Sequence, residues 1–185
     1  MPDWEDDERL AAHYSRTGEP AALETLYRRH IDATYRFTRR FLNSQEDAEE
    51  ATSECWFRAF NALRAGQFRG EARFRTWVFG IARLVCLERL RQPRLPTMSL
   101  SEFTDPTRGT PALLTYLPHE SPIESALLAL SDEHRLVITL CDLEGFTPAE
   151  AGLILGGRTA AATKSLQARA RLRLRDALEK EDQLQ

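Results

Sequence analysis

Cysteine, lysine and long apolar runs are all scarce in this sequence. The three cysteines, Cys55, Cys86 and Cys141, lie far apart, so the chain has neither a C-x-x-C zinc or redox motif nor a disulfide framework. No apolar run reaches the roughly eighteen residues that a membrane span requires. The acidic beginning, MPDWEDDERL, differs from the basic and then apolar pattern of a secretory signal. We therefore expect free thiols, a cytoplasmic location and no membrane insertion.

Residue constellations typical of enzymes are also missing. The four histidines are scattered, and no Ser/His/Asp or metal-ligand spacing links them. The carboxylates between Glu46 and Glu50 form a run, but on a helix they would point around most of its circumference. This arrangement favours a solvated or docking face over catalysis. We expect a protein that is not an enzyme and that has no catalytic residue, metal site or cofactor.

The formal net charge of −3 hides an uneven distribution. Residues 1–27 hold seven acidic residues and two arginines, net −5, whereas residues 28–94 hold fourteen arginines and eight acidic residues, net +6. Residues 95–157 hold nine acidic residues and two arginines, net −7, and residues 158–185 hold seven basic and four acidic residues, net +3. Because arginine binds phosphate through two hydrogen bonds and stacks on bases, two basic blocks favour two contacts with a polyanion. Genome composition would also explain a preference for arginine.

Prolines divide the chain. None lies between Gly70 and Gln92, whereas six lie between Pro93 and Pro122, among serines and threonines. A structureless connection of that length does not belong inside one compact domain. We therefore predict an all-α protein of two small helical domains joined by a flexible Pro-rich linker. The predicted parts are an acidic N-terminal segment at 1–18, a first domain at 19–93, a linker at 94–120 and a second domain at 121–185.

Helix signals fill both predicted domains, and no convincing strand pattern appears. Apolar residues recur at helical spacing from Leu23 to Phe37 and again from Ala48 to Leu63. A third long helix follows a loop and ends before Pro93. The start signals are Pro20, Ser44 with Asp47, Pro122, Ser131 and Thr147-Pro148, and the stop signals are Gly66, Gly145 and Gly156-Gly157.

The segment Thr147–Arg175 has the order of a helix-turn-helix: a short capped helix, a glycine turn and a longer basic helix. In this motif the second helix presents its N-terminal side chains to base edges in the major groove. A basic, solvated helix in an ordinary helical hairpin is the alternative. The candidate DNA-binding residues are Arg158, Thr159, Thr163, Lys164, Gln167 and Arg171.

The stretch from Phe68 to Arg91 concentrates arginines and aromatic residues. On a helical wheel, Trp77, Ile81 and Leu84 share an apolar stripe, and Arg75, Phe79 and Arg83 lie opposite. Arginines follow phosphates and an exposed aromatic ring stacks on an unpaired base, so this combination favours single-stranded nucleic acid. Alternatively, the aromatic residues are the core of a three-helix bundle. The candidates for binding DNA are Phe68, Arg69, Arg73, Arg75, Phe79 and Arg83.

Taken together, the two segments resemble extracytoplasmic-function (ECF) sigma factors, the smallest class of bacterial RNA polymerase specificity subunits. FRGEARFRTWVFGIAR is similar to the family pattern F-R-G-x-x-x-F-x-T-W-L-x-x-I-A-R, and LEGFTPAEAGLILG to L-E-G-x-S-x-x-E-I-A-x-I-L-G. EDAEEATSECWFRAF is similar to the acidic-then-aromatic helix of region 2, and ALETLYRRHIDATYRFTRRFL to its first helix. The resemblance covers roughly residues 19–93 and 121–180.

The resemblance implies partners and roles. The first domain would be sigma region 2, which binds core RNA polymerase and the promoter −10 element. Phe68 and its loop would help to hold a flipped base, and the basic helix after Gly157 would bind the −35 element. An anti-sigma factor is a further implied partner. The residues that would dock on the clamp helices of the largest polymerase subunits are Asp47, Glu49, Glu50, Glu54 and Trp56.

The sequence departs from the family pattern at two places. Leu84 stands where the family usually has asparagine near the base pocket, and the recognition helix needs a one-residue shift to align Lys164-Ser165. Either the −10 readout differs or other residues build the base pocket, and the base contacts of the recognition helix stay open. A two-domain regulator that binds duplex DNA without polymerase is the alternative function. It would leave the segment 68–91 and the acidic-aromatic helix unexplained.

Overall fold

The part of the chain that the structure describes is all-helical, as the sequence predicts. The computed structural model describes residues 4–42, 44–91 and 122–182, so the predicted linker at 94–120 lies outside the described residues. None of the described helices is both long and apolar enough to cross a bilayer. The helices are α1 (Trp4–Thr17), α2 (Pro20–Phe41), α3 (Gln45–Arg64), α4 (Phe74–Arg91), α5 (Pro122–Leu128), α6 (Asp132–Ile138), α7 (Pro148–Ile154) and α8 (Ala160–Asp182), and the π-helical turn η1 (Thr139–Leu143) follows α6.

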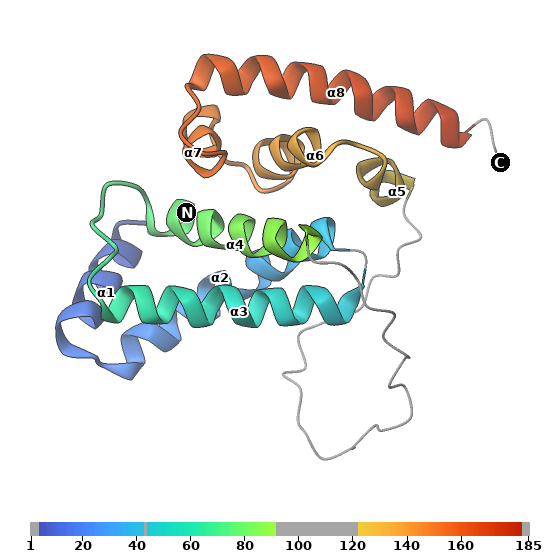
Figure 1. Ribbon diagram of the computed structural model, residues 1–185. Helices are drawn as coiled ribbons and strands as arrows, with labels where there is room; N and C mark the ends of the chain where they lie inside the picture. The colour runs from blue at the N-terminus through green and yellow to red at the C-terminus, as the bar shows by residue number, and fades with distance from the viewer. Residues whose placement is uncertain (1–3, 43, 92–121, 183–185) are drawn as a thin grey trace, which may run out of the picture.

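Helices α1–α4 form one unit, which we call the N-terminal unit (Figure 1). Its centre is the packing of α3 against α2 and α4. Small side chains on α3, such as Ala48, Ala51 and Ala59, are fully buried and allow a close approach of the helices. The side-chain oxygens of Thr38 and Thr52 are 2.8 Å apart and form a buried hydrogen bond where α2 and α3 meet. The buried face of α3 leaves its acidic residues on the outside.

Helix α1 was missed by the sequence analysis, which predicted only an acidic segment there. It packs against α2, α3 and α4 and is held by charged side chains as well as apolar ones. Asp7 is buried and accepts hydrogen bonds from Nη1 of Arg29 and from the ring of His30, each at 2.7 Å. The carboxylate of Glu8 accepts the backbone N–H of Phe74 at 2.7 Å. Helix α1 therefore caps the N-terminus of α4 with a side chain far away in sequence.

Local capping chemistry sets most of the other boundaries. Ser44 accepts the backbone N–H of Asp47 at 3.0 Å, as its position before α3 predicts. Thr147 and Glu150 form a reciprocal capping box at the start of α7. Glycines with positive φ follow α3 and α7, at Gly66 and at Gly156. These are backbone conformations that favour glycine, so the predicted helix ends are confirmed.

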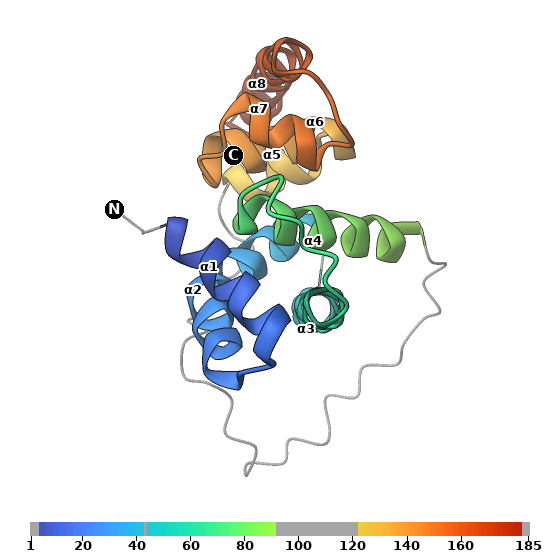
Figure 2. The same cartoon turned by 90° about the vertical axis from the view of Figure 1, so that its left-hand side faces the viewer.

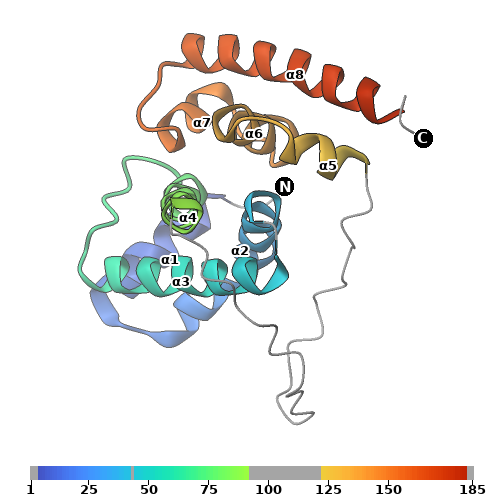
Figure 3. The same cartoon turned by 45° about the vertical axis from the view of Figure 1, so that its right-hand side comes forward.

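Helices α5–α8 form the C-terminal unit, which lies across the α4 side of the N-terminal unit (Figures 2 and 3). Helix α4 packs against α7, and α2 packs against α5. One side chain that joins the units is Arg135 of α6, which is buried. Its guanidinium donates hydrogen bonds to the carbonyl oxygens of Leu127, Leu128 and Leu130 and, at 3.4 Å, to that of Phe41 at the end of α2. The two units therefore share a continuous buried core.

Candidate promoter DNA and polymerase interfaces

Helices α7 and α8 are joined by a tight turn at Gly156-Gly157. Both glycines have positive φ, at 94° and 85°. The N–H groups of Gly157 and Arg158 donate to the carbonyl oxygen of Gly152 at 3.0 and 2.9 Å. Gly152 is buried beneath this turn, and an added Cβ would lie 2.3 Å from the carbonyl oxygen of Arg158. The geometry is that of a helix-turn-helix, in which α8 takes the recognition position.

The predicted residues of α8 divide by exposure. Thr159 and Lys164 are exposed, and the Thr159 hydroxyl accepts the backbone N–H of Ala162 at 3.2 Å. Thr163 is 0% exposed and donates its hydroxyl hydrogen to the carbonyl oxygen of Thr159 at 3.0 Å. This side chain packs toward Gly152 and is not available to a base in this conformation.

Three other residues predicted in this region already have partners within the chain. All three contact carboxylates of the segment that contains α6 and η1. The contacts are Arg158 with Glu133, Gln167 with Asp142 at 2.9 Å, and Arg171 with Asp142.

Helix α4 differs from the predicted wheel. Phe79, expected on the exposed stripe, is 0% exposed, and Leu84, expected on the buried stripe, is 51% exposed. The reason is that α4 is covered on two sides: α2 and α3 cover one side and α7 covers another. A wheel with one buried face cannot describe a helix between two layers. Phe79 packs on Phe37 at 5.2 Å and on Phe146 at 4.9 Å between ring centroids.

The arginines predicted on this helix and its loop have different environments. Arg69 is exposed in the loop, and Arg73 lies 3.7 Å from Glu150 of α7. Burial lowers the pKa of Arg75, against the opposing effect of Glu144. Burial also lowers the pKa of Arg83, and the nearby Arg158 acts in the same direction. Both groups stay cationic, because arginine does not lose its charge in proteins.

Phe68 lies at the rim of the aromatic cluster at the start of α4. Its ring is half-buried and packs on Phe74 at 5.6 Å and on Trp77 at 5.2 Å between centroids. Gly70 follows in the loop with a positive φ of 71°. Part of the Phe68 ring faces solvent next to the exposed Arg69. The loop thus carries a partly exposed aromatic residue followed directly in sequence by an exposed cation.

Helix α3 carries the predicted polymerase-docking residues. Glu49 and Glu50 are exposed, and Asp47 and Glu54 are half-buried. Glu50 pairs with Arg89 at 2.9 Å, and Glu54 pairs with Arg58 at 2.7 Å. Most of the carboxylates therefore border solvent on one side of the N-terminal unit.

Trp56 does not lie on this surface. It is 1% exposed and packs edge-on against Tyr27, with ring centroids 5.2 Å apart. The next residue, Phe57, is 62% exposed. The sequence analysis missed it, although steps of about 100° per residue place Phe57 on the same side of the helix as Glu50 and Glu54. An open hollow of about 540 Å³ is lined by Glu49, Glu50, Ser53, Glu54, Phe57 and Arg89.

The cysteines are free thiols. Burial raises the pKa of Cys55, that of Cys86 to about 12 and that of Cys141 to about 11. Burial therefore disfavours the thiolate, which is the form that acts as nucleophile and metal ligand.

A tight glycine turn followed by a long basic helix, as at α7 and α8, is an arrangement typical of proteins that bind duplex DNA. The model of Sigma-70 region 2 matches residues 26–94. The ECF RNA polymerase sigma factor SigM of Mycobacterium tuberculosis is 32% identical over 170 residues, which cover 91% of this chain and 82% of SigM. The ECF RNA polymerase sigma factor SigE of Mycolicibacterium smegmatis is 30% identical over 189 residues, covering 96% of this chain and 72% of SigE.

Solved structures show the same fold. CnrH, in complex with the cytosolic domain of CnrY, matches with a TM-score of 0.72 and 24% identity, covering 95% of this chain and 98% of CnrH. The sigma factor RpoE of Bartonella quintana, in complex with the anti-sigma factor NepR, matches with a TM-score of 0.65 and 24% identity, covering 84% of this chain and 96% of RpoE.

The chain belongs to the ECF RNA polymerase sigma factors of the sigma-70 family. Sigma factors are transcription-initiation factors and not enzymes. This membership removes the alternative of a regulator that never contacts polymerase.

Proposed function

We propose that residues 19–93 form the region 2 domain, which binds core polymerase and the −10 element, and that residues 121–185 form the region 4 domain, which binds the −35 element. Residues 94–120 link the two. Helix α1, from the acidic segment 1–18, adds to the region 2 domain by packing on three of its helices. The observation that carries the proposal is the helix-turn-helix, which exposes Thr159 directly before α8 and Lys164 in the first turns of α8.

In the −35 complex, the first turns of α8 enter the major groove. Lys164 and Gln167 lie on its exposed or half-exposed surface, whereas the buried Thr163 supports the turn. Arg158 and Arg171 reach phosphates or base edges after they leave their carboxylate partners. A base contact discriminates between sequences by about 1–3 kcal/mol, whereas a phosphate contact strengthens binding to all sequences and adds to the salt dependence.

In the −10 complex, the loop and the first turns of α4 contact the melted strands. Phe68 stacks on a base taken out of the duplex, which contributes about 1–3 kcal/mol per base. Arg69, Arg73, Arg75 and Arg83 are the phosphate contacts. Phe79 can take part only when α7 and the residues before it no longer cover it, because it is fully buried here.

The acidic face of α3 is the docking surface for the clamp helices of the largest polymerase subunit. Asp47, Glu49, Glu50 and Glu54 supply the charge. Trp56 supports this face from inside, and Phe57 supplies the exposed aromatic ring. Aromatic anchors surrounded by polar residues are common centres of binding energy at protein interfaces.

An anti-sigma factor is a further partner. Support comes from the structural neighbours, since RpoE was solved with the anti-sigma factor NepR and CnrH with the cytosolic domain of CnrY. The polymerase that the chain serves lies in the cytoplasm, and the proposed place of action is the same.

Run-off transcription with core polymerase on a library of promoters tests these roles. The wild-type chain should direct initiation from a subset that shares −10 and −35 elements. Gln167→Ala should relax the preference at one −35 position, whereas Lys164→Ala should weaken all promoters alike and flatten the salt dependence. If neither variant changes −35 binding, the assignment of α8 as the recognition helix is wrong.

A further inference from the structure

The loop from Phe68 to Arg73 leads into α4 without a local side-chain cap for that helix. It bends but contains no helical turn. Arg73 holds the N-cap position, because its carbonyl oxygen accepts the backbone N–H of Trp77 at 3.1 Å. An arginine side chain has only donors, so it cannot accept the N–H groups that a helix leaves free at its start. A partner for the first N–H group of α4 must therefore come from another part of the chain.

Glu8 of α1 is that partner. Its Oε1 accepts the backbone N–H of Phe74 at 2.7 Å, across 66 positions of the sequence. Phe74 is fully buried, so water does not reach this N–H group as a substitute. The helix dipole favours a carboxylate at the N-terminus of a helix, and a hydrogen bond to a charged group is stronger than one between neutral groups. Glu8 therefore fixes the point at which the loop ends and α4 begins.

Helix α1 holds Glu8 in place. The neighbouring Asp7 is buried and bonded to Arg29 and His30 of α2, each at 2.7 Å. About one turn further along, Ala11 is fully buried in the core. The carboxylate of Glu8 is therefore carried by a helix that is anchored on either side of it.

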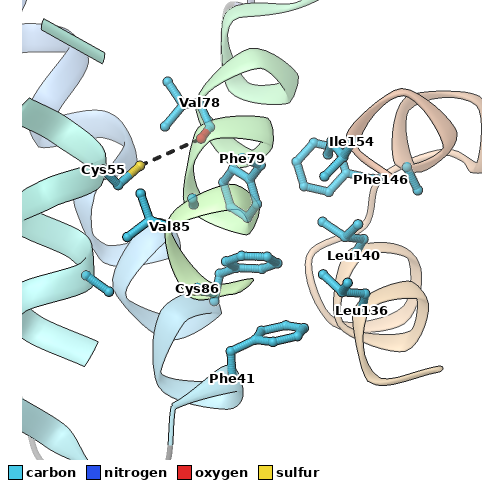
Figure 4. Packing of buried hydrophobic residues seen from close by; sticks show 14 of the residues in the cluster. Phe41, Cys55, Val78, Phe79, Val85, Cys86, Leu136, Leu140, Phe146 and Ile154 are labelled. Carbon is cyan, nitrogen blue, oxygen red and sulfur yellow. Dashed lines mark hydrogen bonds between the residues drawn. The ribbon is translucent and has the colours of Figure 1, made fainter. Parts of the chain in front are cut away.

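The body of α4 is fixed without Glu8. The thiol of Cys55 on α3 donates to the carbonyl oxygen of Val78 at 3.7 Å (Figure 4). Phe79 packs on Phe37 of α2, and Figure 4 shows Phe146 facing Phe79 from the C-terminal unit. Loss of the Glu8 contact would thus free the first turn of α4 and the loop before it, while the rest of the helix stays in place.

The position of Phe68 follows that of this first turn. Its ring packs on Phe74 at 5.6 Å and on Trp77 at 5.2 Å between centroids. Phe74 is also the residue whose N–H group Glu8 binds. A shift of that N–H group therefore moves one of the two rings that support Phe68.

The C-terminal unit also contacts this region, through the residues next to the loop. Arg73 lies 3.7 Å from Glu150, and Arg75 donates to the carbonyl oxygen of Glu144 at 2.7 Å. The carboxylate of Glu144 accepts a further hydrogen bond from Arg40 at 2.5 Å. These carboxylates belong to the unit assigned to the −35 element. Glu8 belongs to the same unit as the loop, so its contact does not depend on where the C-terminal unit binds.

We propose that Glu8 is a positioning residue for promoter opening, which holds the loop 68–73 in the conformation that presents Phe68 to an unpaired base of the −10 element. The proposal rests on the role of Phe68 proposed above. Glu8 itself does not contact DNA, because its carboxylate is bonded to Phe74. Its effect precedes DNA binding, since a loop that is already ordered loses less conformational entropy when a base stacks on Phe68.

Two substitutions of Glu8 separate its hydrogen bond from its charge. Glu8→Ala removes the acceptor, whereas Glu8→Gln keeps an acceptor oxygen and removes only the charge. Holoenzymes are assembled with each chain on a promoter that the wild type opens. In Glu8→Ala, permanganate reactivity of thymines near −10 should fall about fivefold, the factor by which loss of a typical helix cap shifts an equilibrium. Binding of the duplex promoter should stay near that of wild type, and Glu8→Gln should recover most of the opening.

Hydrogen exchange of the Phe74 amide in the free chain is a second measurement, which does not depend on polymerase. This amide should exchange about fivefold faster in Glu8→Ala than in wild type, and near the wild-type rate in Glu8→Gln. Faster exchange together with normal opening would overturn the positioning role. Wild-type exchange and wild-type opening in Glu8→Ala would contradict both the contact and the role.

Glu24→Ala is the matched control. It removes the same carboxylate from an exposed position on α2, so it reports the change in net charge alone and should open the promoter like wild type. Equal loss of opening in Glu8→Ala and Glu8→Gln, or in Glu8→Ala and Glu24→Ala, would refute the proposal. If far-UV circular dichroism shows that Glu8→Ala disturbs the fold, Glu8→Met takes its place, because methionine keeps the length of the side chain without a strong acceptor.

Failure of the proposed function gives a different result. If the wild-type chain opens no promoter with core polymerase, the proposed function fails, whereas exchange of the Phe74 amide still reports the contact with Glu8. If wild type opens promoters and Glu8→Ala opens them equally well, only the positioning role fails.

Discussion

Replacement of Gly152 by alanine should destabilise the helix-turn-helix, although alanine is the residue in the family pattern I-A-x-I-L-G at this position. An alanine Cβ would lie 2.3 Å from the carbonyl oxygen of Arg158 and 3.0 Å from Oγ1 of Thr163. Ordinary carbon–oxygen contacts are about 3.3 Å or longer, so the turn would have to move by about 1 Å.

The loss of stability in Gly152→Ala depends on which atoms must move to make room for the new Cβ. The nearest atom belongs to the backbone, and the N–H groups of Gly157 and Arg158 are bonded to the carbonyl oxygen of Gly152 itself. Overpacking of a core typically costs about 1–3 kcal/mol, and we expect the upper part of this range because no flexible side-chain end can give way. The midpoint of thermal unfolding should fall by about 6–12 °C for a chain of this length.

Gly80→Ala is the matched control. Gly80 lies inside α4, and a Cβ added there would meet nothing within 4 Å. Alanine should stabilise the helix by about 0.5–1 kcal/mol. Denaturant unfolding followed by circular dichroism measures both variants, and −35 binding measures the displacement of α8. A Gly152→Ala protein as stable as wild type would refute the argument, since the turn would then move at no cost.

Phe57→Ala should weaken binding to core polymerase about tenfold, because a truncated aromatic anchor typically costs more than 1 kcal/mol; a titrated pull-down measures it, and unchanged affinity would remove Phe57 from the docking surface. Phe68→Ala should spare duplex promoter binding by the holoenzyme but impair opening, read as lost permanganate reactivity of thymines near −10; normal reactivity would assign the ring to the core. Asp7→Asn should lower the free energy of unfolding by about 1–3 kcal/mol at neutral pH. Burial alone would raise the pKa of Asp7, but hydrogen bonds from His30 and Arg29 outweigh it and hold this pKa below 3.8. The stabilisation by the Asp7 carboxylate is therefore present above about pH 4 and is lost as the pH falls through the folded-state pKa of Asp7. A difference in stability between wild type and Asp7→Asn that persists undiminished at pH 2 would contradict this reasoning.

Local chemistry made most of the fold predictable. Pro20, Ser44 and Thr147 start helices where the sequence indicates, because each acts on backbone groups only a few residues away. The sequence analysis missed helix α1 because some of the residues that hold it in place are far away in the sequence. Asp7 is buried only through Arg29 and His30, which lie more than twenty positions further along.

The candidate sites were predictable as segments and less so as side chains. The direction of Phe79 and Leu84 depends on the docking of α7 against α4, a contact that no local pattern encodes. Similarly, Trp56 and Phe57 are adjacent and both aromatic, and Trp56 is the buried one, with Tyr27 and Phe60 packed against it. Thr163 points inward, next to Gly152 of α7. No local sequence pattern predicts this contact between the two helices.

The ion pair between Arg40 and Glu144 joins residues 104 positions apart. The entropic cost of closing such a loop grows only with the logarithm of its length, at about 0.6 kcal/mol for each doubling. An insertion of thirty residues between α4 and α5 would lengthen the loop from Arg40 to Glu144 by less than a third. The entropic cost of forming the ion pair would thus rise by only about a few tenths of a kcal/mol. Related chains can therefore differ widely in the length of this connection while natural selection acts on the residues at the two faces that meet.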